Sequence, residues 1–557
     1  MELLETILEK RGIMGEEERE IFLNPDYKRD LHDPFLMKDM ERACVRLYEA
    51  IENKEKIVIY ADYDCDGIPG AVILCDLFKK INYSNYEVYI PQRNSEGYGL
   101  NLEAIKQFAE AGVKLLITVD LGITAVAEVA QTEVDDIDVI ITDHHLPPEV
   151  LPRAYAILNP KTDDYPGKML CGAGVVFKLV QGFIKKYGEY FKIKDGAEKW
   201  MLDMAGLATL SDMVPLLGEN RAIAHFGMTV LRKSPRPGLQ KLLAKMNIDQ
   251  KYLTEDDVGF MLAPRLNAAS RMASPLLAYE LLSTEDEVEA GILADQLSKI
   301  NDDRKSIVVS IMREVNKNFE KRSAGELREV IVIGNPSWRV GVLGLVAGKI
   351  SDEHNKPVFV WGKDENSCIK GSCRSDGSVS VVELMAATGE FFTDFGGHEL
   401  AGGFTVKNDK IHFLEEALSL SFNKIKKEEK SNDLSGDFSN GLLHDINTDL
   451  DAVNMKNWKE LAKLAPFGIG NEKPIFLFEG VKVEKIKKFG KNGSEEHLEI
   501  AFSNKEGHKS KAVSFFSNHN SFKIPIAEGG NVNLLATFDL SRWRGREELR
   551  LRVTDII

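Results

Sequence analysis

Aspartates recur at alternate positions in one short segment, ADYDCDGIPG, which contains Asp62, Asp64 and Asp66. Three carboxylates this close repel one another, and a bound cation relieves that repulsion. Alternate Asp residues followed by Gly also begin a calcium-binding loop. That loop requires a Glu six residues after the Gly, where this chain has Ile73. The spacing therefore predicts a divalent-cation site that is not a calcium loop.

Further carboxylates and a histidine pair follow two other apolar runs. KLLITVD ends in Asp120, and IDVIITDHH ends in Asp143, His144 and His145. A helical segment, MLDMAGLATLSDMVPL, carries Asp212 in apolar surroundings. Any one of these aspartates is also explained as a helix N-cap. Taken together, oxygen ligands with one or two imidazoles suit Mn²⁺ or Mg²⁺ and predict a two-metal site for phosphoryl hydrolysis.

The elements that must position these residues are strands of a parallel sheet. Apolar runs at 56–62, 86–91, 114–120 and 137–143 alternate with helical segments. This alternation is typical of an α/β domain with helices on both faces of the sheet. Ligands of such sheets bind beyond the carboxyl ends of the strands, so we expect the acidic residues to converge there.

A long helix and two further domains are predicted in the second half of the chain. Residues 284–320 are helical without proline, either as a surface helix or as a connector between domains. A second α/β unit follows from residue 329, and the charged stretch IKKEEKSNDLSGD near 425–435 is typical of a linker. Short alternating strands beyond about residue 470 predict a small β-barrel.

The size and charge of the chain restrict its organisation and partners. Its 557 residues exceed the roughly 250–300 of a single core and predict roughly three to four domains. A net charge of −16 means that a nucleic-acid partner requires a local basic surface. The segment RWRGREELRLR (542–552) offers one, because its five Arg and two Glu give a local charge of +3.

Composition also bears on the cellular setting. No run approaches the roughly 18 apolar residues of a membrane span, and the N-terminus lacks the pattern of a secretory signal. The six cysteines include no CxxC pair. We therefore expect a reduced, cytoplasmic protein without a structural zinc site.

The motifs as a set resemble those of a known superfamily. The DHH phosphoesterases have four motifs that are matched in order by DYDCDG, VDLGIT, ITDHHLP and GLATLSDMVPL. Motifs of the RecJ family of single-strand-specific exonucleases within that superfamily are similar to APRLNAASRM, WRVGVLGLVAGKI, GSCRS, GGHELAGGF and PFGIGNEKPIF. The resemblance runs from about residue 50 to the C-terminus.

The resemblance implies a fold class and a division of the chain. The fold would be α/β: a parallel-sheet DHH domain, joined by a long helix to a second α/β, DHH-associated domain, with a C-terminal OB-like β-barrel. The expected bounds are 1–50 for an N-terminal helical segment, 51–282 for the DHH domain, 283–325 for the connector helix, 326–430 for the DHH-associated domain and 431–557 for the OB-like nucleic-acid-binding domain.

By the same resemblance, site residues take three roles. The metal ligands would be Asp64, Asp66, Asp120, His144 and Asp212. The residues that complete the catalytic site would be Asp62, Asp143, His145 and His398. The strand and its terminal phosphate would be held by Arg93, Arg271, Ser372, Arg374 and Trp543. Simpler interpretations remain: Asp62 could cap a turn, His398 could be a core histidine, and either Arg93 or Arg271 could form a surface ion pair.

The implied activity is metal-dependent 5′-to-3′ exonuclease action on single-stranded DNA, in DNA repair and recombination, with Mn²⁺ or Mg²⁺ as two ions. An alternative is a DHH phosphodiesterase of short oligonucleotides or cyclic dinucleotides, and another is a DNA-binding relative without activity. The expected partners are single-stranded DNA, a helicase and a single-strand-binding protein. We expect a cytoplasmic monomer with no membrane association.

Overall fold

The computed structural model describes residues 3–93, 96–320, 328–432, 444–490, 497–518, 521–543 and 546–557, without the side chains of 428–432 and 543. The chain forms two compact units. The small unit comprises Met1–His32, Met213–Phe226 and Asp437–Ile557, and the large unit comprises Asp33–Asp212 and Gly227–Gly436. All the described residues predicted for the metal site lie in the large unit.

The first sheet of the large unit is parallel throughout, in the order β2-β1-β3-β4-β5. Its strands are β1 (Lys56–Ala61), β2 (Tyr86–Tyr89), β3 (Val113–Val119), β4 (Asp138–Thr142) and β5 (Ala156–Leu158). The central strands β1, β3 and β4 are almost wholly buried, as their continuous apolar sequences predict. The predicted α/β sheet is therefore confirmed, with the three acidic strand ends on adjacent strands.

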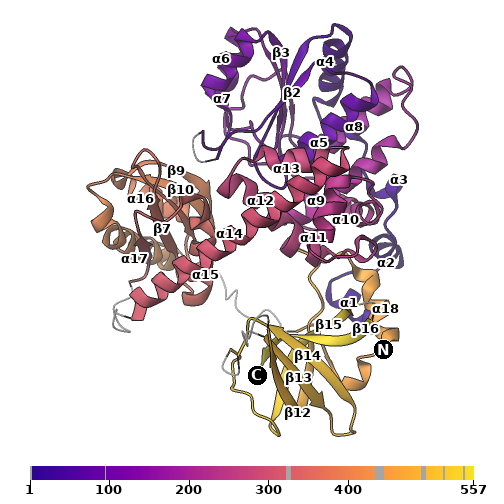
Figure 1. The fold of residues 1–557 in the computed structure, drawn as a ribbon, viewed down its shortest axis with the longest axis vertical. Helices are drawn as coiled ribbons and strands as arrows, with labels where there is room; N and C mark the ends of the chain where they lie inside the picture. The colour runs from indigo at the N-terminus through magenta and orange to yellow at the C-terminus, as the bar shows by residue number, and fades with distance from the viewer. Residues whose placement is uncertain are drawn as a thin grey trace. The chain divides into compact units, whose positions relative to one another are not determined.

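Helices cover both faces of this sheet (Figure 1). One face carries α6 (Leu102–Glu110) and α7 (Val126–Val134), and the other carries α4 (Met40–Glu52), α5 (Gly67–Lys80) and α8 (Gly172–Tyr187). Helix α6 is capped by Asn101, whose side chain accepts hydrogen bonds from the N–H groups of Glu103 and Ala104. Its Ile105 and Phe108 then pack in the core beneath. Helix α5 is buried along most of its length because it packs on the sheet and is also contacted by α8, α9 (Leu202–Ser211) and α13 (Leu276–Ser283).

A helical region completes the DHH part of the large unit. It comprises η1 (Pro34–Leu36), η2 (Ala197–Met201), α9 (Leu202–Ser211), α11 (Pro237–Lys245), η3 (Gln250–Tyr252), the π-helix η4 (Asp257–Leu262), α12 (Ala263–Met272) and α13 (Leu276–Ser283). Helix α10 (Gly218–Leu231) supplies residues to both units. The predicted long helix is α14 (Glu287–Glu320), which runs unbroken from α13 toward the second sheet (Figure 1).

The second sheet has the order β6-β7-β8-β10-β9, parallel between β6 and β7 and antiparallel elsewhere. Its elements are β6 (Ile331–Gly334), η5 (Val340–Val342), α15 (Leu343–His354), β7 (Val358–Lys363), β8 (Ile369–Arg374), α16 (Val381–Ala387), η6 (Gly389–Phe391), β9 (Phe392–His398), β10 (Ala401–Val406), η7 (Ile411–Phe413) and α17 (Leu414–Asn432). The linker predicted near 425–435 is wrong as far as Asn432, because α17 continues through it. Lys and Glu are strong helix formers, and Leu418 and Ile425 hold the helix on the core.

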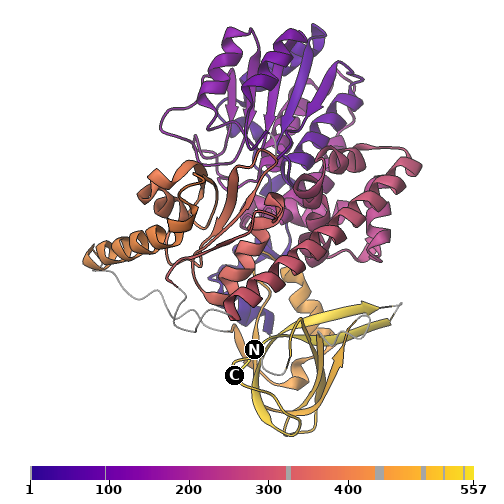
Figure 2. The same cartoon turned by 60° about the vertical axis from the view of Figure 1, so that its left-hand side comes forward.

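The small unit contains the predicted β-barrel (Figure 2). Its sheet has the order β11-β12-β13-β14-β16-β15, and pairing of β12 with β15 closes it. The elements are α1 (Leu3–Lys10), α2 (Glu16–Leu23), α3 (Tyr27–Asp30), β11 (Ile446–Thr448), η8 (Leu450–Ala452), α18 (Met455–Leu461), η9 (Ala462–Leu464), β12 (Phe476–Phe489), β13 (His497–Ser503), β14 (Lys509–Phe515), β15 (Asn531–Trp543) and β16 (Arg546–Ile556).

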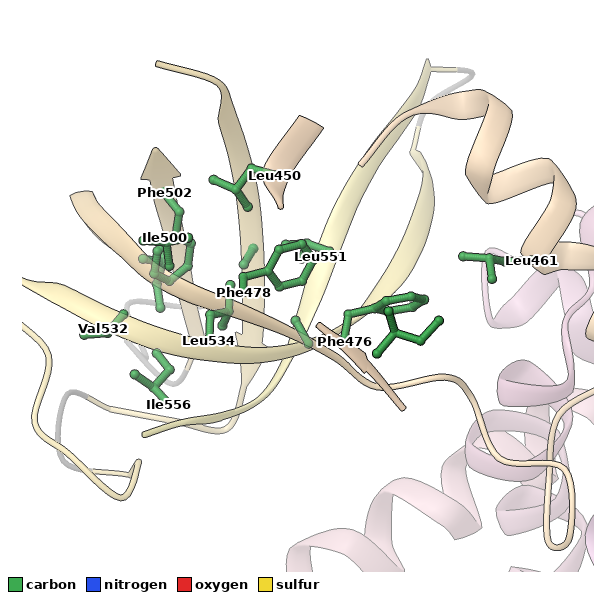
Figure 3. Close-up of a cluster of buried hydrophobic side chains, with 14 of the residues drawn as sticks. Leu450, Leu461, Phe476, Phe478, Ile500, Phe502, Val532, Leu534, Leu551 and Ile556 are labelled. Carbon is green, nitrogen blue, oxygen red and sulfur yellow. The ribbon is translucent and has the colours of Figure 1, made fainter. Parts of the chain in front are cut away.

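The barrel core is built from alternate strand residues such as Phe476, Phe478 and Leu551 (Figure 3). The N-terminal helix belongs to the same core, because Leu4, Ile7 and Leu8 of α1 are buried in this cluster. In the described residues of both units, no helix has the length and apolar character needed to cross a bilayer.

Candidate metal centre

Three adjacent strands are each followed directly by an aspartate whose backbone bonds to the neighbouring strand or its end. The N–H of Asp62 donates to the Val119 carbonyl at 3.0 Å, and that of Asp120 donates to the Thr142 carbonyl at 2.9 Å. The N–H of Asp143 donates to the Leu158 carbonyl at 3.0 Å. Asp120 also has a left-handed φ of 62°, which is uncommon for a residue other than glycine. The backbone of all three aspartates is thus held where the strands end.

The predicted ligands meet at this edge. The Nε2 atom of His144 lies 3.2 Å from Oδ1 of Asp120, 3.7 Å from Oδ2 of Asp212 and 3.8 Å from Oδ2 of Asp66. Three overlapping sets have potential ligand atoms within 4.8 Å of one another: Asp120, His144 and His145; Asp66, His144 and Asp212; and Asp62, Asp64 and Asp120. All five predicted ligands are in these sets, together with Asp62 and His145.

Two of the buried carboxylates each have an oxygen that no described protein donor reaches. Among the described residues, Oδ1 of Asp62 and Oδ1 of Asp120 are buried without a hydrogen-bond partner. Burial and neighbouring carboxylates raise the pKa of both groups well above the ordinary range. The same two causes raise the pKa of Asp66 to about 7 and that of Asp212 to about 9. Divalent cations would offset this charge, so the residues fit a divalent metal.

His144 is in the form that binds metals. Burial, and then the neighbouring His145, lower the pKa of His144 to about 3, so its imidazole is neutral at physiological pH. A hydrogen bond from the ring to the backbone of Leu170 fixes its orientation. Neutral imidazole with its second nitrogen engaged in this way is the usual state of a metal-ligating histidine.

Asp143 orients the second histidine. Its Oδ1 accepts from the backbone N–H of His144 and His145, and lies 2.8 Å from Nδ1 of the His145 ring. Its Oδ2 accepts from the N–H of Ile123 at 2.9 Å. Burial alone would raise the pKa of Asp143, but these hydrogen bonds outweigh it and lower the pKa. The His145 ring in turn faces His398 of the second sheet, with centroids 5.9 Å apart and planes 6° from parallel.

Asp64 and Asp66 have different local partners. Oδ1 of Asp64 accepts from the N–H groups of Asp66 and Gly67, so this carboxylate also stabilises its own turn. Asp66 accepts at both oxygens from the first residues of α8, Gly172 at 2.6 Å and Ala173 at 2.7 Å. The N-terminus of a helix stabilises a nearby carboxylate. The start of α8 therefore holds the Asp66 side chain in place at the site.

Sequence reasoning missed the role of Gly172. A Cβ atom at this position would lie 2.5 Å from Cβ of Asp120, so a side chain here would displace that carboxylate. The only local signal is the pair of glycines in CGAG at the start of a helix.

It also missed the turn after β5. The side-chain amide of Asn159 donates to the His145 carbonyl at 2.9 Å, and the Lys161 ammonium donates to the His144 carbonyl. Within the turn, the N–H of Lys161 donates to Oδ1 of Asn159 at 2.9 Å. The positive charge of Lys161 counteracts the rise in the pKa of Asp212.

Predicted phosphate-binding residues form a cationic group in the same unit. Burial, and then the neighbouring Arg93, Arg304 and Arg374, lower the pKa of Arg271 to about 9. The Arg93 guanidinium lies 5.0 Å over the ring of Tyr63. Arg374 and Ser372 lie together beside Gly344 near the start of α15. Guanidinium groups that repel one another in this way would be stabilised by a bound anion. Arg304 of α14 also belongs to this group, and the sequence did not predict it.

The predicted base-stacking residue lies in the barrel. Trp543 is the last residue of β15, and its side chain lies outside the described residues. In the neighbouring basic segment, two arginines already have carboxylate partners: Arg542 contacts Glu547 at 2.8 Å, and Arg550 contacts Asp539 at 2.7 Å. Of these two carboxylates only Asp539 lies outside the segment, so its pairing with Arg550 offsets one unit of the local charge of +3.

Three family profiles match the chain in succession. The DHH family, N-terminal domain, matches residues 56–209, the DHHA1 domain matches 329–427 and the RecJ OB domain matches 444–555. These matches cover the first sheet, the second sheet and the barrel.

Related proteins match over most of the chain. A single-stranded-DNA-specific exonuclease RecJ of Bacillus subtilis is 34% identical over 99% of this chain and 67% of its own length. The Haemophilus influenzae protein of the same name is 29% identical over 94% of this chain and 92% of its own. The crystal structure of RecJ from Thermus thermophilus in complex with Mn²⁺ superposes with a TM-score of 0.80 at 25% identity, covering 100% of this chain and 75% of that one.

Proposed function

This chain belongs to the RecJ family of DHH phosphoesterases, and from that premise we propose its reaction: it is a metal-dependent exonuclease that hydrolyses phosphodiester bonds of single-stranded DNA. The observation that carries this assignment is the convergence of buried carboxylates and a neutral imidazole, with Oδ1 of Asp62 and of Asp120 unpartnered among the described residues. Mn²⁺ or Mg²⁺ is the cofactor that such a donor set accepts.

For the site residues we propose the roles that their contacts support. The ligands of two ions are assigned to Asp64, Asp66, Asp120, His144 and Asp212, with Asp62 beside them. When bound, divalent ions supply Lewis-acid chemistry that acidifies water and neutralises charge developing on the phosphate. Asp143 holds the His145 ring by a 2.8 Å contact, and we propose that His145 and the His398 ring that faces it orient the scissile phosphate.

We propose 5′-to-3′ polarity from the cationic group. Arg93, Arg271 and Arg374, with the Ser372 hydroxyl, supply donors for a terminal phosphate, and Arg can bind such a group bidentately. A pocket that requires a terminal phosphate selects a free strand end. The fixed order of the metal ligands and this group along the strand would then set the direction of degradation.

The setting and the organisation of the chain are proposals as well. We propose action in DNA repair and recombination in the cytoplasm, as a monomer, on strands delivered by a helicase or a single-strand-binding protein. We propose that residues 51–282 carry the metal chemistry, that 326–430 bind the terminal phosphate and that 283–325 connect these two parts. Residues 431–557 would hold the strand, and 1–50 would form an N-terminal segment. Within the strand-holding part, Trp543 is proposed as a residue that stacks on bases. The alternative of a small-substrate phosphodiesterase is not favoured, because residues 444–555 match the RecJ OB domain.

One gel tests the reaction and its polarity. Single strands labelled at the 5′ or the 3′ end, duplex DNA and RNA are each incubated with Mn²⁺, Mg²⁺ or a chelator. We expect early release of small products from the 5′ label, a shortening ladder from the 3′ label, and no reaction with chelator. The opposite label pattern would overturn the polarity, and unchanged cleavage in chelator would overturn the metal dependence.

A further inference from the structure

The turn beyond β5 holds the backbone of both histidines that follow β4. Asn159 is almost fully buried, and its side-chain amide makes two hydrogen bonds. Its Nδ2 donates to the His145 carbonyl, and its Oδ1 accepts from the N–H of Lys161. The half-buried Lys161 side chain then returns to the His144 carbonyl. These contacts join two loops across the carboxyl edge of the sheet.

We propose that Lys161 is a positioning residue for metal binding, which rests on the function proposed above. The His144 ring must bring Nε2 to the oxygens of Asp66, Asp120 and Asp212, which lie 3.2–3.8 Å away. The backbone of that histidine has no regular element to hold it, because β4 ends at Thr142. The Lys161 hydrogen bond supplies this restraint at the His144 carbonyl, and Asn159 supplies it at the next residue.

The chemistry of the contact explains why a cation is used. A charged donor makes a stronger hydrogen bond to a carbonyl than a neutral one does. The ammonium also places a positive charge near Asp143 and Asp212, whose carboxylates interact with it electrostatically. Lys161 therefore fixes the backbone of the histidine, and we expect this restraint to outweigh the repulsion between its charge and a bound cation. Groups that orient metal ligands typically contribute about 10-fold to 100-fold to metal affinity.

The test measures Mn²⁺ binding to the full chain by isothermal titration calorimetry without DNA. We expect Lys161→Met to weaken Mn²⁺ affinity by about 10-fold to 100-fold, and Lys161→Arg to restore most of it because arginine can donate to the same carbonyl. Lys168→Met removes the same charge from an exposed position on the same loop and should bind Mn²⁺ like the unaltered chain. Lys161→Ala, which also lacks a donor, replaces the Met variant if the latter fails to fold.

Kinetics separate this role from direct contact with DNA. At limiting Mn²⁺ the Lys161→Met variant should show a reduced kcat that excess Mn²⁺ recovers, with KM for the strand unchanged. A raised KM with unaltered Mn²⁺ affinity would overturn the proposal and make Lys161 a strand contact. Because binding is measured with Mn²⁺ alone, the result stands even if the unaltered chain proves not to degrade DNA.

Discussion

At the scale of single residues, the site gathers several carboxylates whose negative charge the neighbouring protein groups do not fully offset. Asp62 and Asp120 are buried, and one oxygen of each has no hydrogen-bond partner among the described residues. Asp143 is the contrast: it is equally buried but fully hydrogen-bonded, so its pKa is lowered. We propose that this difference separates carboxylates that bind a cation from one that orients a histidine.

The stability of the metal-free chain should therefore fall as the pH rises. In the folded chain the pKa of Asp66 is about 7 and that of Asp212 about 9, against an ordinary value of 3.8. Between about pH 4 and about pH 9 the folded state binds more protons than the unfolded state, so raising the pH lowers the free energy of unfolding.

We expect the Tm in chelator to decrease over that range. Mn²⁺ at 100 times its Kd should add about 2.7 kcal/mol and remove most of the pH dependence. A Tm in chelator that rises with pH through this range would contradict the charge assignment.

Asp120→Asn tests the same balance at one residue. The amide keeps the shape of the side chain but removes a buried negative charge, so the variant should lose Mn²⁺-dependent DNA hydrolysis while its Tm in chelator increases. Activity is measured with a 3′-labelled single strand, and Tm by differential scanning calorimetry. Glu103→Gln, at an exposed position on α6, is the matched control and should change neither quantity.

At the scale of elements, the sequence predicts those features that depend on the local pattern of apolar residues. The strands and the convergence of Asp62, Asp120 and Asp143 follow from continuous apolar runs and from the parallel order of neighbouring strands. The contact of Gly172 with Asp66 was beyond reach, because it joins residues 106 positions apart and depends on where α8 begins. The contacts of Asn159 and Lys161 were missed for the same reason. Their partners are backbone carbonyl groups of another loop, and every residue has such a group whatever its type.

A buried ion pair among the helices carries the next prediction. Arg236, just before α11, contacts Asp203 of α9 at 2.8 Å and also pairs with Asp76 of α5. Asp203 is 2% exposed, so Asp203→Ala removes a buried negative partner of the Arg236 guanidinium. The variant should lower the free energy of unfolding by about 3–5 kcal/mol.

The control is an exposed ion pair between α11 and α14. Lys241 of α11 contacts Glu287 of α14 at 3.2 Å, and their side chains are 40% and 78% exposed, so Lys241→Ala should cost about 0–1 kcal/mol. Both variants are measured by urea unfolding. Equal losses would mean that the buried pair contributes no more than the exposed one.

At the scale of the whole molecule, the barrel is not built from the C-terminal sequence alone. Leu4, Ile7 and Leu8 of α1 lie in the same buried cluster as Phe476 and Leu464. Strand alternation predicted the barrel, but no pattern in residues 1–32 indicated that they pack with residues beyond 437. Removing the tail would therefore uncover α1, and a deletion is a poor test of what the barrel binds.

Point substitutions on the barrel surface avoid that difficulty. Lys485 and Lys487 of β12 are exposed, whereas Arg542 and Arg550 are already paired with carboxylates. If the barrel holds the strand, the double variant Lys485→Ala/Lys487→Ala should bind a long single strand more weakly. The slope of log affinity against log salt should become shallower by about 0.7 for each phosphate that the variant no longer neutralises, or about 1.4 in total.

Fluorescence anisotropy between about 50 and about 200 mM KCl measures this slope, and dinucleotide hydrolysis measures the metal site separately. Dinucleotide hydrolysis should be unchanged, because a dinucleotide needs only the metal site and the terminal-phosphate group. The double variant Lys106→Ala/Lys349→Ala removes the same charge from exposed positions of the large unit and should leave the slope unaltered. An equal reduction on long strands and dinucleotides would mean that the β12 lysines support the fold of the barrel rather than hold the strand.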